Sequence, residues 1–383
     1  KDKVAQAGIR TLGYHDLLKK KDHASASKIK EYGEKAIKNL SNANSSVSRA
    51  ESIAYLGWNL LELARSHSED VAWDLYEDLG RSVFDPDEPL RLFLQTEEPS
   101  IVITSNSPRS ERAALLIADE LGIPSICIVD FFPILQDWIY HGQIKSQICV
   151  AHPIVRDLLI TNGLHSTRVH FTGNPDFDNV ASAVFELKKQ NSGCKSEPSY
   201  LQNILYVSSP EGDRHVIKGY ADHSKMPNPT LMADTLFALR DFAESNLLNV
   251  SVRRHPSESP EVYESVLRDL GSRCFDIQNP LSVSVPEALS KADLVVTHCS
   301  TLGVIAALCG IPTIKVFGSM YDEDVPTHIL GIYVDQVSIS ELGYALDKLA
   351  AGDSFDCDRL IPIYPRATNR IVEVIATQLG LQI

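Results

Sequence analysis

The stretch KADLVVTHCSTLGVIAALCGIPTI, residues 291–314, decides the fold class of this protein. Its segment DLVVTHC (293–299) predicts a strand, and the apolar run DLVV is of the kind found in parallel sheets that helices cover on both faces. The stretch STLGVIAALCG (300–310) predicts a helix, and IPTIKVFG (311–318) predicts the next strand. Strand, helix and strand in succession indicate an α/β fold.

The same alternation continues on both sides of this stretch. The strands predicted in the first half are SIVITS (100–105), SICIVDFF (125–132), QICVA (147–151) and RVHFTG (168–173). After a polar stretch at 187–202, which reads as an exposed linker, the predicted strands include NILYVSS (203–209) and NVSVRRHP (249–256). We expect SIVITS to be covered on both faces.

Two α/β halves joined by a linker predict two Rossmann-like domains with parallel sheets that face a cleft. The predicted N-terminal domain spans residues 1–185, the C-terminal domain 200–360, and a closing helix 361–383. Residues 1–100 are mostly helical in pattern, and the charged segment 19–38 predicts a solvated helical insertion. The chain begins with Lys1 and shows no strand before residue 100, so we expect its natural start to be missing.

Composition limits the classes of function. Of 383 residues, 36 are Lys or Arg and 50 are Asp or Glu, which gives a net charge of -14. This balance disfavours nucleic-acid binding and general attachment to anionic membranes, because both need clustered positive charge; only a local basic patch could dock there. No apolar run reaches 18 residues, the length that indicates a transmembrane helix. The seven cysteines have no CxxC spacing, which predicts free thiols in a reducing compartment.

The first candidate residues follow the strand NILYVSS. Ser208, Ser209 and Gly212 are small, so backbone amides can approach a phosphate there, and the hydroxyls can donate as well. An ordinary strand-to-helix loop has the same composition, and both interpretations stay open. Glu211 and Asp222 lie in the same long loop, and each is a candidate carboxylate nucleophile.

The second group ends the strand NVSVRRHP. Arg253 and Arg254 would place positive charge at the cleft edge, where it suits a diphosphate or a nucleoside monophosphate leaving group. His255, which precedes Pro256, could protonate a departing phosphate. The alternative is a basic turn before a helix whose N-cap is Ser257.

The third group follows the strand DLVV and comprises His298, Ser300 and Thr301. The unpaired N–H groups and positive dipole end of the helix that begins here make an anion site, although an ordinary Ser/Thr N-cap has the same pattern. In the first half, Asp130 ends the strand SICIV. It is a candidate base for an acceptor hydroxyl or, equally, a structural turn residue.

The sequence lacks the motifs that indicate several kinds of functional site. There is no HExxH and no clustered Cys/His spacing, so no metal site is predicted. The run Asp322, Glu323 and Asp324 could hold a hard cation, but a solvated loop is the favoured interpretation. GxGxxG after a strand, GxxxxGKS/T and GxSxG are absent, which disfavours NAD enzymes, P-loop NTPases and α/β-hydrolases. No cofactor is predicted.

Three stretches resemble GT-B-fold nucleotide-sugar enzymes of bacterial surface polysaccharide biosynthesis. Residues 151–180, AHPIVRDLLITNGLHSTRVHFTGNPDFDNV, resemble the end of the N-terminal domain in surface-polysaccharide glycosyltransferases and hydrolysing UDP-N-acetylglucosamine 2-epimerases. Residues 249–259, NVSVRRHPSES, resemble the His-Pro motif of bacterial sialyltransferases, Kdo transferases and teichoic-acid glycerophosphotransferases. Residues 291–314 resemble the donor-phosphate strand–loop–helix of the same group. The resemblance implies an N-terminal acceptor domain and a C-terminal donor domain.

In the His-Pro families the histidine and a later Ser/Thr pair hold the nucleotide phosphate, which implies these roles for His255, Ser300 and Thr301. The chain departs from the epimerases in two places. The helix stretch LGVIAAL lacks the glutamate that grips the ribose, and RRHPSE replaces an HRREN-like motif. Both departures favour a CMP- or CDP-linked donor. The acid-acid-Gly motif that supplies the base in sialyltransferases has its nearest counterpart in EDLG, residues 77–80, which we expect in a helix.

We therefore expect a cytoplasmic, metal-independent glycosyltransferase for lipopolysaccharide or capsule assembly. It would move a sugar from a nucleotide-sugar donor, such as CMP-linked Kdo or sialic acid, to a glycan or glycolipid acceptor. Peripheral docking at the inner membrane face is compatible with this expectation. The alternative enzyme is a hydrolysing nucleotide-sugar 2-epimerase of the same fold. The alternative outside the enzymes is a non-catalytic nucleotide-sugar-binding domain of a larger glycan-assembly protein.

Overall fold

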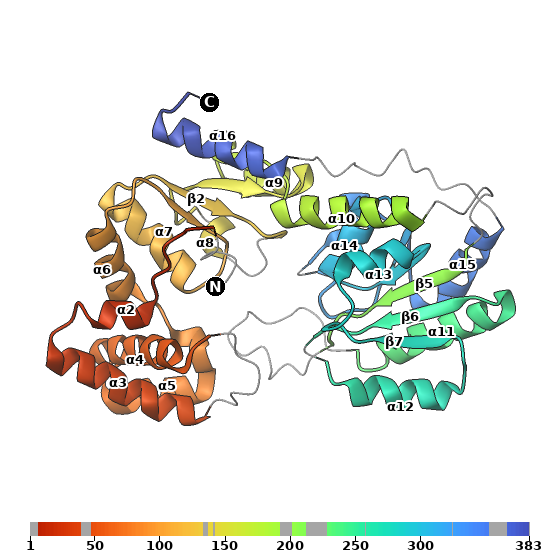
Figure 1. Ribbon diagram of the computed structural model, residues 1–383, viewed down its shortest axis with the longest axis horizontal. Coiled ribbons are helices and arrows are strands. Elements are labelled where there is room, and N and C mark those ends of the chain that lie inside the picture. The colour runs from red at the N-terminus through yellow and green to blue at the C-terminus, as the bar shows by residue number, and fades with distance from the viewer. Residues whose placement is uncertain are drawn as a thin grey trace. The chain divides into compact units, whose positions relative to one another are not determined.

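The structure is a computed structural model that describes residues 7–39, 47–132, 137–140, 142–191, 201–211, 228–256, 258–323, 325–351 and 366–382. The chain divides into two compact units. The first comprises Lys1–Val129, Gln136–Ile148 and Val374–Ile383, and the second comprises Asp130–Leu135 and Cys149–Glu373. Figure 1 shows the helices and strands of both units in chain order.

A helical layer precedes the first sheet. Its helices are α2 (Tyr14–Leu18), α3 (His23–Ala36), α4 (Arg49–Ser66), α5 (Glu69–Leu79) and α6 (Asp87–Glu97). The layer has a core of its own, in which Trp58 and Tyr32 are almost fully buried. The stretch EDLG ends α5, as expected, because Gly80 is the C-cap of that helix.

The charged segment 19–38 is not the solvated insertion that its composition predicts. Within it, α3 buries Ile29, Tyr32, Gly33 and Ala36, which recur at the spacing of one helix face. A Cβ at Gly33 would lie 2.0 Å from the carbonyl oxygen of Ile53 on α4. The two helices therefore pack backbone against backbone, and the lysines occupy only the outer face of α3.

The first sheet has four strands in the order β1 (Val102–Thr104), β2 (Ser125–Ile128), β3 (Gln147–Val150) and β4 (Val169–Phe171). The helices α7 (Ser110–Leu121), α8 (Asp137–Tyr140) and α9 (Pro153–Thr161) lie between these strands in the chain. β1 runs parallel to β2. Gly122 ends α7 in the left-handed conformation, as its position predicts.

The expectation that SIVITS is covered on both faces is wrong. β1 forms the edge of its sheet, and the side chain of Ile103 is 44% exposed. An apolar run of this length cannot distinguish a central strand from an edge strand, because the neighbours decide its burial.

The second sheet has six strands in the order β10-β9-β8-β5-β6-β7, and all five pairs are parallel. The strands are β5 (Asn203–Val207), β6 (Asn249–Arg253), β7 (Phe275–Gln278), β8 (Leu294–Thr297), β9 (Thr313–Val316) and β10 (Asp335–Val337). The α-helices described between β4 and the end of this sheet's segment of the chain are α10 (Pro175–Asn191), α11 (Leu231–Asn246), α12 (Pro260–Leu270), α13 (Val285–Lys291), α14 (Thr301–Leu308) and α15 (Leu342–Ala350). The final helix, α16, spans Ala367–Leu379.

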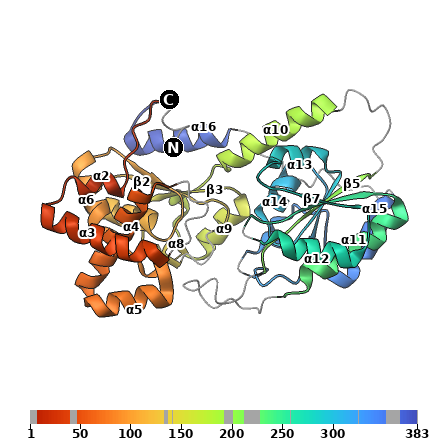
Figure 2. The ribbon, with the colours of Figure 1, turned by 60° about the horizontal axis from the view of Figure 1, so that its bottom comes forward.

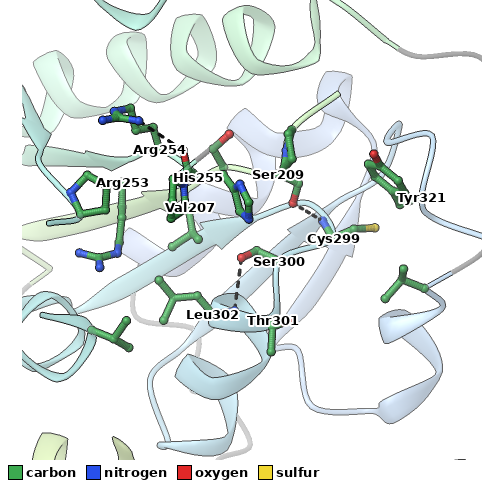
Figure 3. A pocket seen from close by; sticks show the side chains of 16 residues that line it. Val207, Ser209, Arg253, Arg254, His255, Cys299, Ser300, Thr301, Leu302 and Tyr321 are labelled. Atoms are coloured by element: carbon green, nitrogen blue, oxygen red, sulfur yellow. Dashed lines mark hydrogen bonds between the residues drawn. The ribbon is translucent and has the colours of Figure 1, made fainter. Parts of the chain in front are cut away.

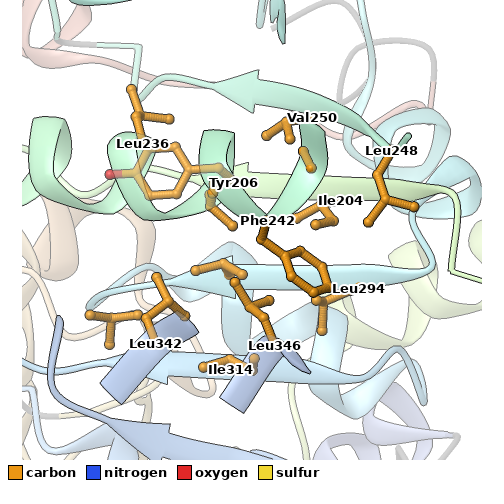
Figure 4. Close-up of a cluster of buried hydrophobic side chains, with 14 of the residues drawn as sticks. Ile204, Tyr206, Leu236, Phe242, Leu248, Val250, Leu294, Ile314, Leu342 and Leu346 are labelled. Carbon is orange, nitrogen blue, oxygen red and sulfur yellow. The ribbon is translucent and has the colours of Figure 1, made fainter. Parts of the chain in front are cut away.

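Helices cover both faces of the six-stranded sheet. In Figures 1 and 2, α11, α12 and α15 lie on one face, and α13 and α14 lie on the other. The core beneath α11 and α15 joins side chains from strand and helix, including Ile204, Val250, Phe242 and Leu346 (Figure 4). The molecule is therefore an α/β protein with the doubly wound arrangement that the sequence predicts. None of the helices in the described part of the chain combines the length and the hydropathy that a membrane-spanning segment needs.

Candidate functional site

The strand order of the six-stranded sheet creates a crevice at the carboxyl end of β5. β5 pairs with β6 on one side and with β8 on the other, so the chain leaves the central strand in opposite directions. Val207 stands in register with both Arg253 and Thr297. The loops that follow these three strands therefore begin at one level, which is where ligands of open α/β sheets bind.

A pocket of about 510 Å³ occupies this place (Figure 3). Eight residues predicted from the sequence line it: Ser208, Ser209, Arg253, Arg254, His255, Pro256, Ser300 and Thr301. The other lining residues are Val207, Pro210, Pro280, Val285, Cys299, Leu302, Tyr321 and Val325. Polar groups gather between β5, β6 and β8, and apolar side chains complete the walls.

One side of the pocket is the N-terminus of α14. Ser300 is the N-cap, and its Oγ accepts a hydrogen bond from the Leu302 N–H at 3.3 Å. Ser209 Oγ accepts in the same way from the Cys299 N–H at 3.0 Å, and Figure 3 draws both bonds. A hydroxyl that accepts a hydrogen bond keeps its own proton for another partner. Ser209 and Ser300 can therefore both donate to an anion at the positive end of the helix.

The close approach of α14 to β8 fixes this helix end. A Cβ at Gly303 would lie 2.4 Å from Cγ2 of Thr297, so a larger residue would push the helix away from the strand. Thr297 is fully buried, and its Oγ1 donates to the carbonyl of Val207 at 3.3 Å. Glycine at this position allows the helix N-terminus to face the crevice.

The opposite side of the pocket carries the basic residues. Arg253 is largely buried, its Nη1 donates to the carbonyl of Val283 at 2.9 Å, and burial lowers the pKa of its guanidinium. Arg254 donates from Nη1 to the carbonyl of Glu258 at 2.6 Å. The side chain of His255 is exposed. The predicted helix follows, but it begins at Pro260 with Ser259 as its N-cap, whereas the sequence analysis considered Ser257.

A carboxylate that the sequence analysis missed organises this loop. Glu258 accepts from Ser208 Oγ and from the Tyr263 hydroxyl, both at 2.9 Å, and from the His255 N–H at 2.7 Å. The Tyr263 hydroxyl also lies within hydrogen-bond distance of Ser208. Burial is the main reason that the pKa of the Tyr263 hydroxyl is raised, and the charge of Glu258 adds to it. The hydroxyl of Ser208 is thus directed into this network.

His298 lies inside the protein and does not line the pocket, in contrast to its predicted contact with phosphate. It is 1% exposed, and its ring nitrogens bond to the Thr235 hydroxyl at 3.3 Å and to the carbonyl of Val316 at 3.1 Å. Burial lowers the pKa of His298 to about 4, so the ring is neutral near pH 7. The His298 side chain is therefore not among the residues that line the pocket.

A buried ion pair lies beneath the loop before α14. Lys315 Nζ is 2.8 Å from Asp322 Oδ1 and also donates to the carbonyl of His298 at 3.1 Å. The Gly318 N–H donates to the other oxygen of Asp322 at 2.7 Å. Burial alone would raise the pKa of the Asp322 carboxyl, but Lys315 and these hydrogen bonds outweigh it, and the net shift is downward. Asp322 is therefore neither a solvated loop residue nor a cation ligand.

This ion pair also affects Cys299, which lines the pocket. The Cys299 thiol is 3.2 Å from Asp322 Oδ1 and 3.3 Å from Lys315 Nζ. Burial raises the pKa of the thiol to about 12, so it stays protonated near pH 7. Cys127, Cys149, Cys274 and Cys309 are free thiols as well, in agreement with the sequence analysis.

The other predicted site residues lie elsewhere or outside the described residues. Oε2 of Glu211 accepts from the backbone N–H groups of Asn228 at 3.2 Å and Met320 at 3.1 Å. Asp130 is exposed after β2, and its carbonyl accepts from the Asn174 side chain at 2.6 Å. Gly212 and Asp222 lie outside the described residues. In the described part of the chain, no group of three or more His, Cys, Asp or Glu side chains could hold a metal ion.

Comparisons with known proteins relate the chain to solved structures. No family model and no curated protein matches the sequence. The S. aureus MnaA–UDP structure is similar with a TM-score of 0.55 and 17% identity, over 80% of this chain and 82% of that chain. The Neisseria meningitidis UDP-GlcNAc 2-epimerase bound to UDP-GlcNAc is similar with a TM-score of 0.52 and 15% identity, over 76% of this chain and 79% of that chain.

A third structure extends this similarity. The Methanocaldococcus jannaschii UDP-GlcNAc 2-epimerase, in complex with UDP-GlcNAc and UDP, has a TM-score of 0.52 and 14% identity, over 76% of this chain and 81% of that chain. At such low identity the likeness concerns the fold alone. Together with the two parallel sheets, it shows that the chain has a GT-B-like fold.

Proposed function

We propose that this protein is a GT-B glycosyltransferase whose donor is a nucleotide-sugar. The pocket at the carboxyl ends of β5, β6 and β8 carries the proposal, because it combines a helix N-terminus, two serine donors and a basic loop. These are the groups that recognise phosphate. A pocket of about 510 Å³ lies in the size range of small-molecule sites. The solved structures of similar fold that contain UDP or UDP-GlcNAc support a ligand of this class.

The residues of the pocket have complementary tasks in this proposal. Ser209, Ser300 and the positive end of the α14 dipole hold the phosphate oxygens. Arg254 and His255 approach from the other side and stabilise the negative charge that develops on the departing nucleotide. His255 can also protonate that phosphate. The acceptor hydroxyl and its base come from outside the described pocket, whose lining includes no Asp or Glu. Asp130 stays the proposed base.

The nucleotide is proposed to be CMP-linked, in a sugar such as Kdo or sialic acid. The helix α14 has the sequence TLGVIAAL, with no acid to bind a ribose. The acceptor is proposed to be a hydroxyl of a bacterial surface glycan or glycolipid. The proposal places the enzyme in the cytoplasm, with peripheral docking at the inner membrane face as its route to a lipid-linked acceptor.

An acceptor-dependence assay tests the transferase proposal. Purified protein is incubated with CMP-sialic acid, CMP-Kdo, UDP-GlcNAc and other nucleotide-sugars, with and without a panel of surface-glycan acceptors. We expect nucleotide release that depends on the acceptor and persists with a chelator present. His255→Ala should lower the rate at least about tenfold, the loss expected for one phosphate-stabilising group. Restoration by a divalent metal after chelation would contradict the metal-independent mechanism.

A hydrolysing 2-epimerase is the second candidate, because several solved structures of similar fold are UDP-GlcNAc 2-epimerases. It would release UDP and an altered sugar without any acceptor. The same assay separates the two enzymes: acceptor-independent UDP release with inversion at the sugar C2 supports the epimerase. Tight nucleotide binding with no turnover in any mixture would instead indicate a non-catalytic binding domain.

A further inference from the structure

Glu258 connects three parts of the second unit through one carboxylate. Oε1 accepts from Ser208, which follows β5, and from Tyr263, which lies on α12. Oε2 accepts from the backbone N–H of His255, in the loop after β6. Ser208 and His255 line the pocket, whereas Glu258 itself does not. Any effect of Glu258 on a ligand therefore passes through these neighbours.

The protons of this network can be assigned from the donors and acceptors. A carboxylate only accepts hydrogen bonds, so the Ser208 hydroxyl is the donor in its hydrogen bond with Glu258. Ser208 and Tyr263 are 2% and 1% exposed, so their hydroxyls have little access to water. Consequently Ser208 has no proton left for a phosphate, in contrast to Ser209 and Ser300. The serine hydroxyls available to an anion are the two on the α14 side of the pocket.

We propose that Glu258 is a positioning residue of the pocket: it fixes the His255 backbone against the end of β5, so that the imidazole faces the phosphate bound at α14. This inference rests on the proposed function, because it assigns Glu258 a task in the same anion site. The backbone turn supports it, since the Glu258 N–H donates to the carbonyl of His255 at 3.0 Å. Glu258 therefore holds His255 through both its side chain and its main chain.

The direction of the mutational effect distinguishes positioning from simple electrostatics. A carboxylate near an anion site repels the anion, so its neutralisation alone would strengthen phosphate binding. Loss of positioning would weaken it. In Glu258→Gln the amide must direct an N–H group towards either the His255 N–H or the two hydroxyls, so the pattern of acceptors cannot be reproduced.

Calorimetric binding of inorganic pyrophosphate, CMP and UDP tests the proposal on wild type, Glu258→Gln and Glu261→Gln. Glu261 is the matched control, since it is exposed in the first turn of α12, three residues after Glu258, and accepts a hydrogen bond from Ser259. We expect Glu258→Gln to weaken binding about tenfold and Glu261→Gln less than about twofold. In a His255→Ala background the Glu258→Gln effect should nearly vanish, because one residue acts through the other.

The outcomes separate this inference from the proposed function. Equal or tighter binding by Glu258→Gln, or full additivity with His255→Ala, overturns the positioning role. If Glu258→Gln does not fold, Glu258→Asp keeps the charge but shortens the reach, and unchanged affinity in that variant overturns the role. If the wild type binds pyrophosphate but neither CMP nor UDP, the proposed function is contradicted. The positioning role of Glu258 is then tested with pyrophosphate as the only ligand. Binding of neither ligand contradicts both.

Discussion

The two sheets of this molecule use the polar residues after their strands in different ways. In the four-stranded sheet these residues mainly serve nearby backbone. Glu111 accepts from the Ser107 N–H at 3.1 Å, and His152 Nδ1 accepts from the Ile154 N–H at 3.2 Å as the N-cap of α9. Such local caps satisfy the ends of helices and strands. An exception is Asn174 after β4, whose side chain donates to the carbonyl of Asp130 after β2 at 2.6 Å.

In the six-stranded sheet the corresponding residues link one strand to another through side chains. Glu258 joins the ends of β5 and β6, and Lys315 of β9 reaches the carbonyl that follows β8. Ser209 connects the end of β5 to the loop before α14. The pocket lies inside this network. The difference teaches that the strand order places the crevice, and that cross-strand polar contacts then hold the loops around it.

Among the changes that test this comparison, removal of the buried lysine should alter the unfolding free energy most. Lys315→Met leaves the carboxylate of Asp322 buried without its cation, which costs about 3–5 kcal/mol of unfolding free energy. Urea unfolding of the wild type and the variant measures the loss. Lys291→Met is the control, because Lys291 forms an exposed pair with Glu287 that contributes under about 1 kcal/mol. Equal stability of Lys315→Met and the wild type would show that the network does not hold this unit together.

Acid should destabilise both sheets, since each has a buried neutral histidine. Burial lowers the pKa of His152 and of His298 from 6.5 to about 4. Both rings stay neutral in the fold but take up a proton in the unfolded chain. Their stability contribution is therefore complete above about pH 6.5 and falls towards pH 4, by roughly 3 kcal/mol per histidine. Unfolding free energies between pH 7.5 and 4.5 should decline less steeply in His298→Gln. Identical slopes would contradict the buried neutral state.

Substitutions at two helical glycines allow the packing in the two units to be compared. A Cβ at Gly57 on α4 would lie 1.8 Å from the Ile29 carbonyl oxygen, so Gly57→Ala should destabilise the helical layer by about 1–3 kcal/mol. Gly343 on α15 has no neighbour within 4 Å of such a Cβ. Gly343→Ala should therefore stabilise its helix by roughly 0.5–1 kcal/mol. Thermal unfolding measures both changes, and the same sign for the two variants would count against the α3–α4 packing.

Removal of a single hydroxyl from the pocket should have the smallest effect, a modest loss of nucleotide affinity. Ser209→Ala removes one donor to a bound phosphate and should weaken nucleotide binding about fivefold, the effect of one hydrogen bond. Ser105, which follows β1 of the other sheet and donates to Glu111, is the matched position. Calorimetry should find unchanged affinity in Ser105→Ala. Equal losses in the two variants would mean that the binding site is not confined to the six-stranded sheet.

Much of this fold could be predicted from the sequence, because buried parallel strands appear as short apolar runs. β5, β6, β8 and β9 lie within their predicted segments, and the residues after three of them line the pocket. The strand β7 was missed, since three of its four residues are not buried and the buried one is the polar Gln278. Short edge strands such as β10 carry equally little signal.

The contacts within the site could not be predicted in the same way. Glu258 and Ser208 are 50 residues apart in the chain, and no local sequence pattern predicts their hydrogen bond. Lys315 and Asp322 looked like a strand lysine and a loop acid, and only the burial of both reveals the ion pair. The inner face of α3 was detectable, because Ile29, Gly33 and Ala36 have helical spacing. The surrounding lysines dominated the composition of the segment and concealed it.

Nucleotide binding to the six-stranded sheet is the most direct test of the central claim. Thermal unfolding is followed for wild type, His255→Ala and His165→Ala with CMP, CDP, UMP, UDP, GDP and CMP-sugars. His165 is exposed and lies before β4, so it serves as the control. A ligand of the folded state raises the melting temperature by mass action. We predict that a cytidine or uridine nucleotide stabilises wild type and His165→Ala but stabilises His255→Ala far less. Equal stabilisation of all three proteins, or of none, would contradict a nucleotide site in this pocket.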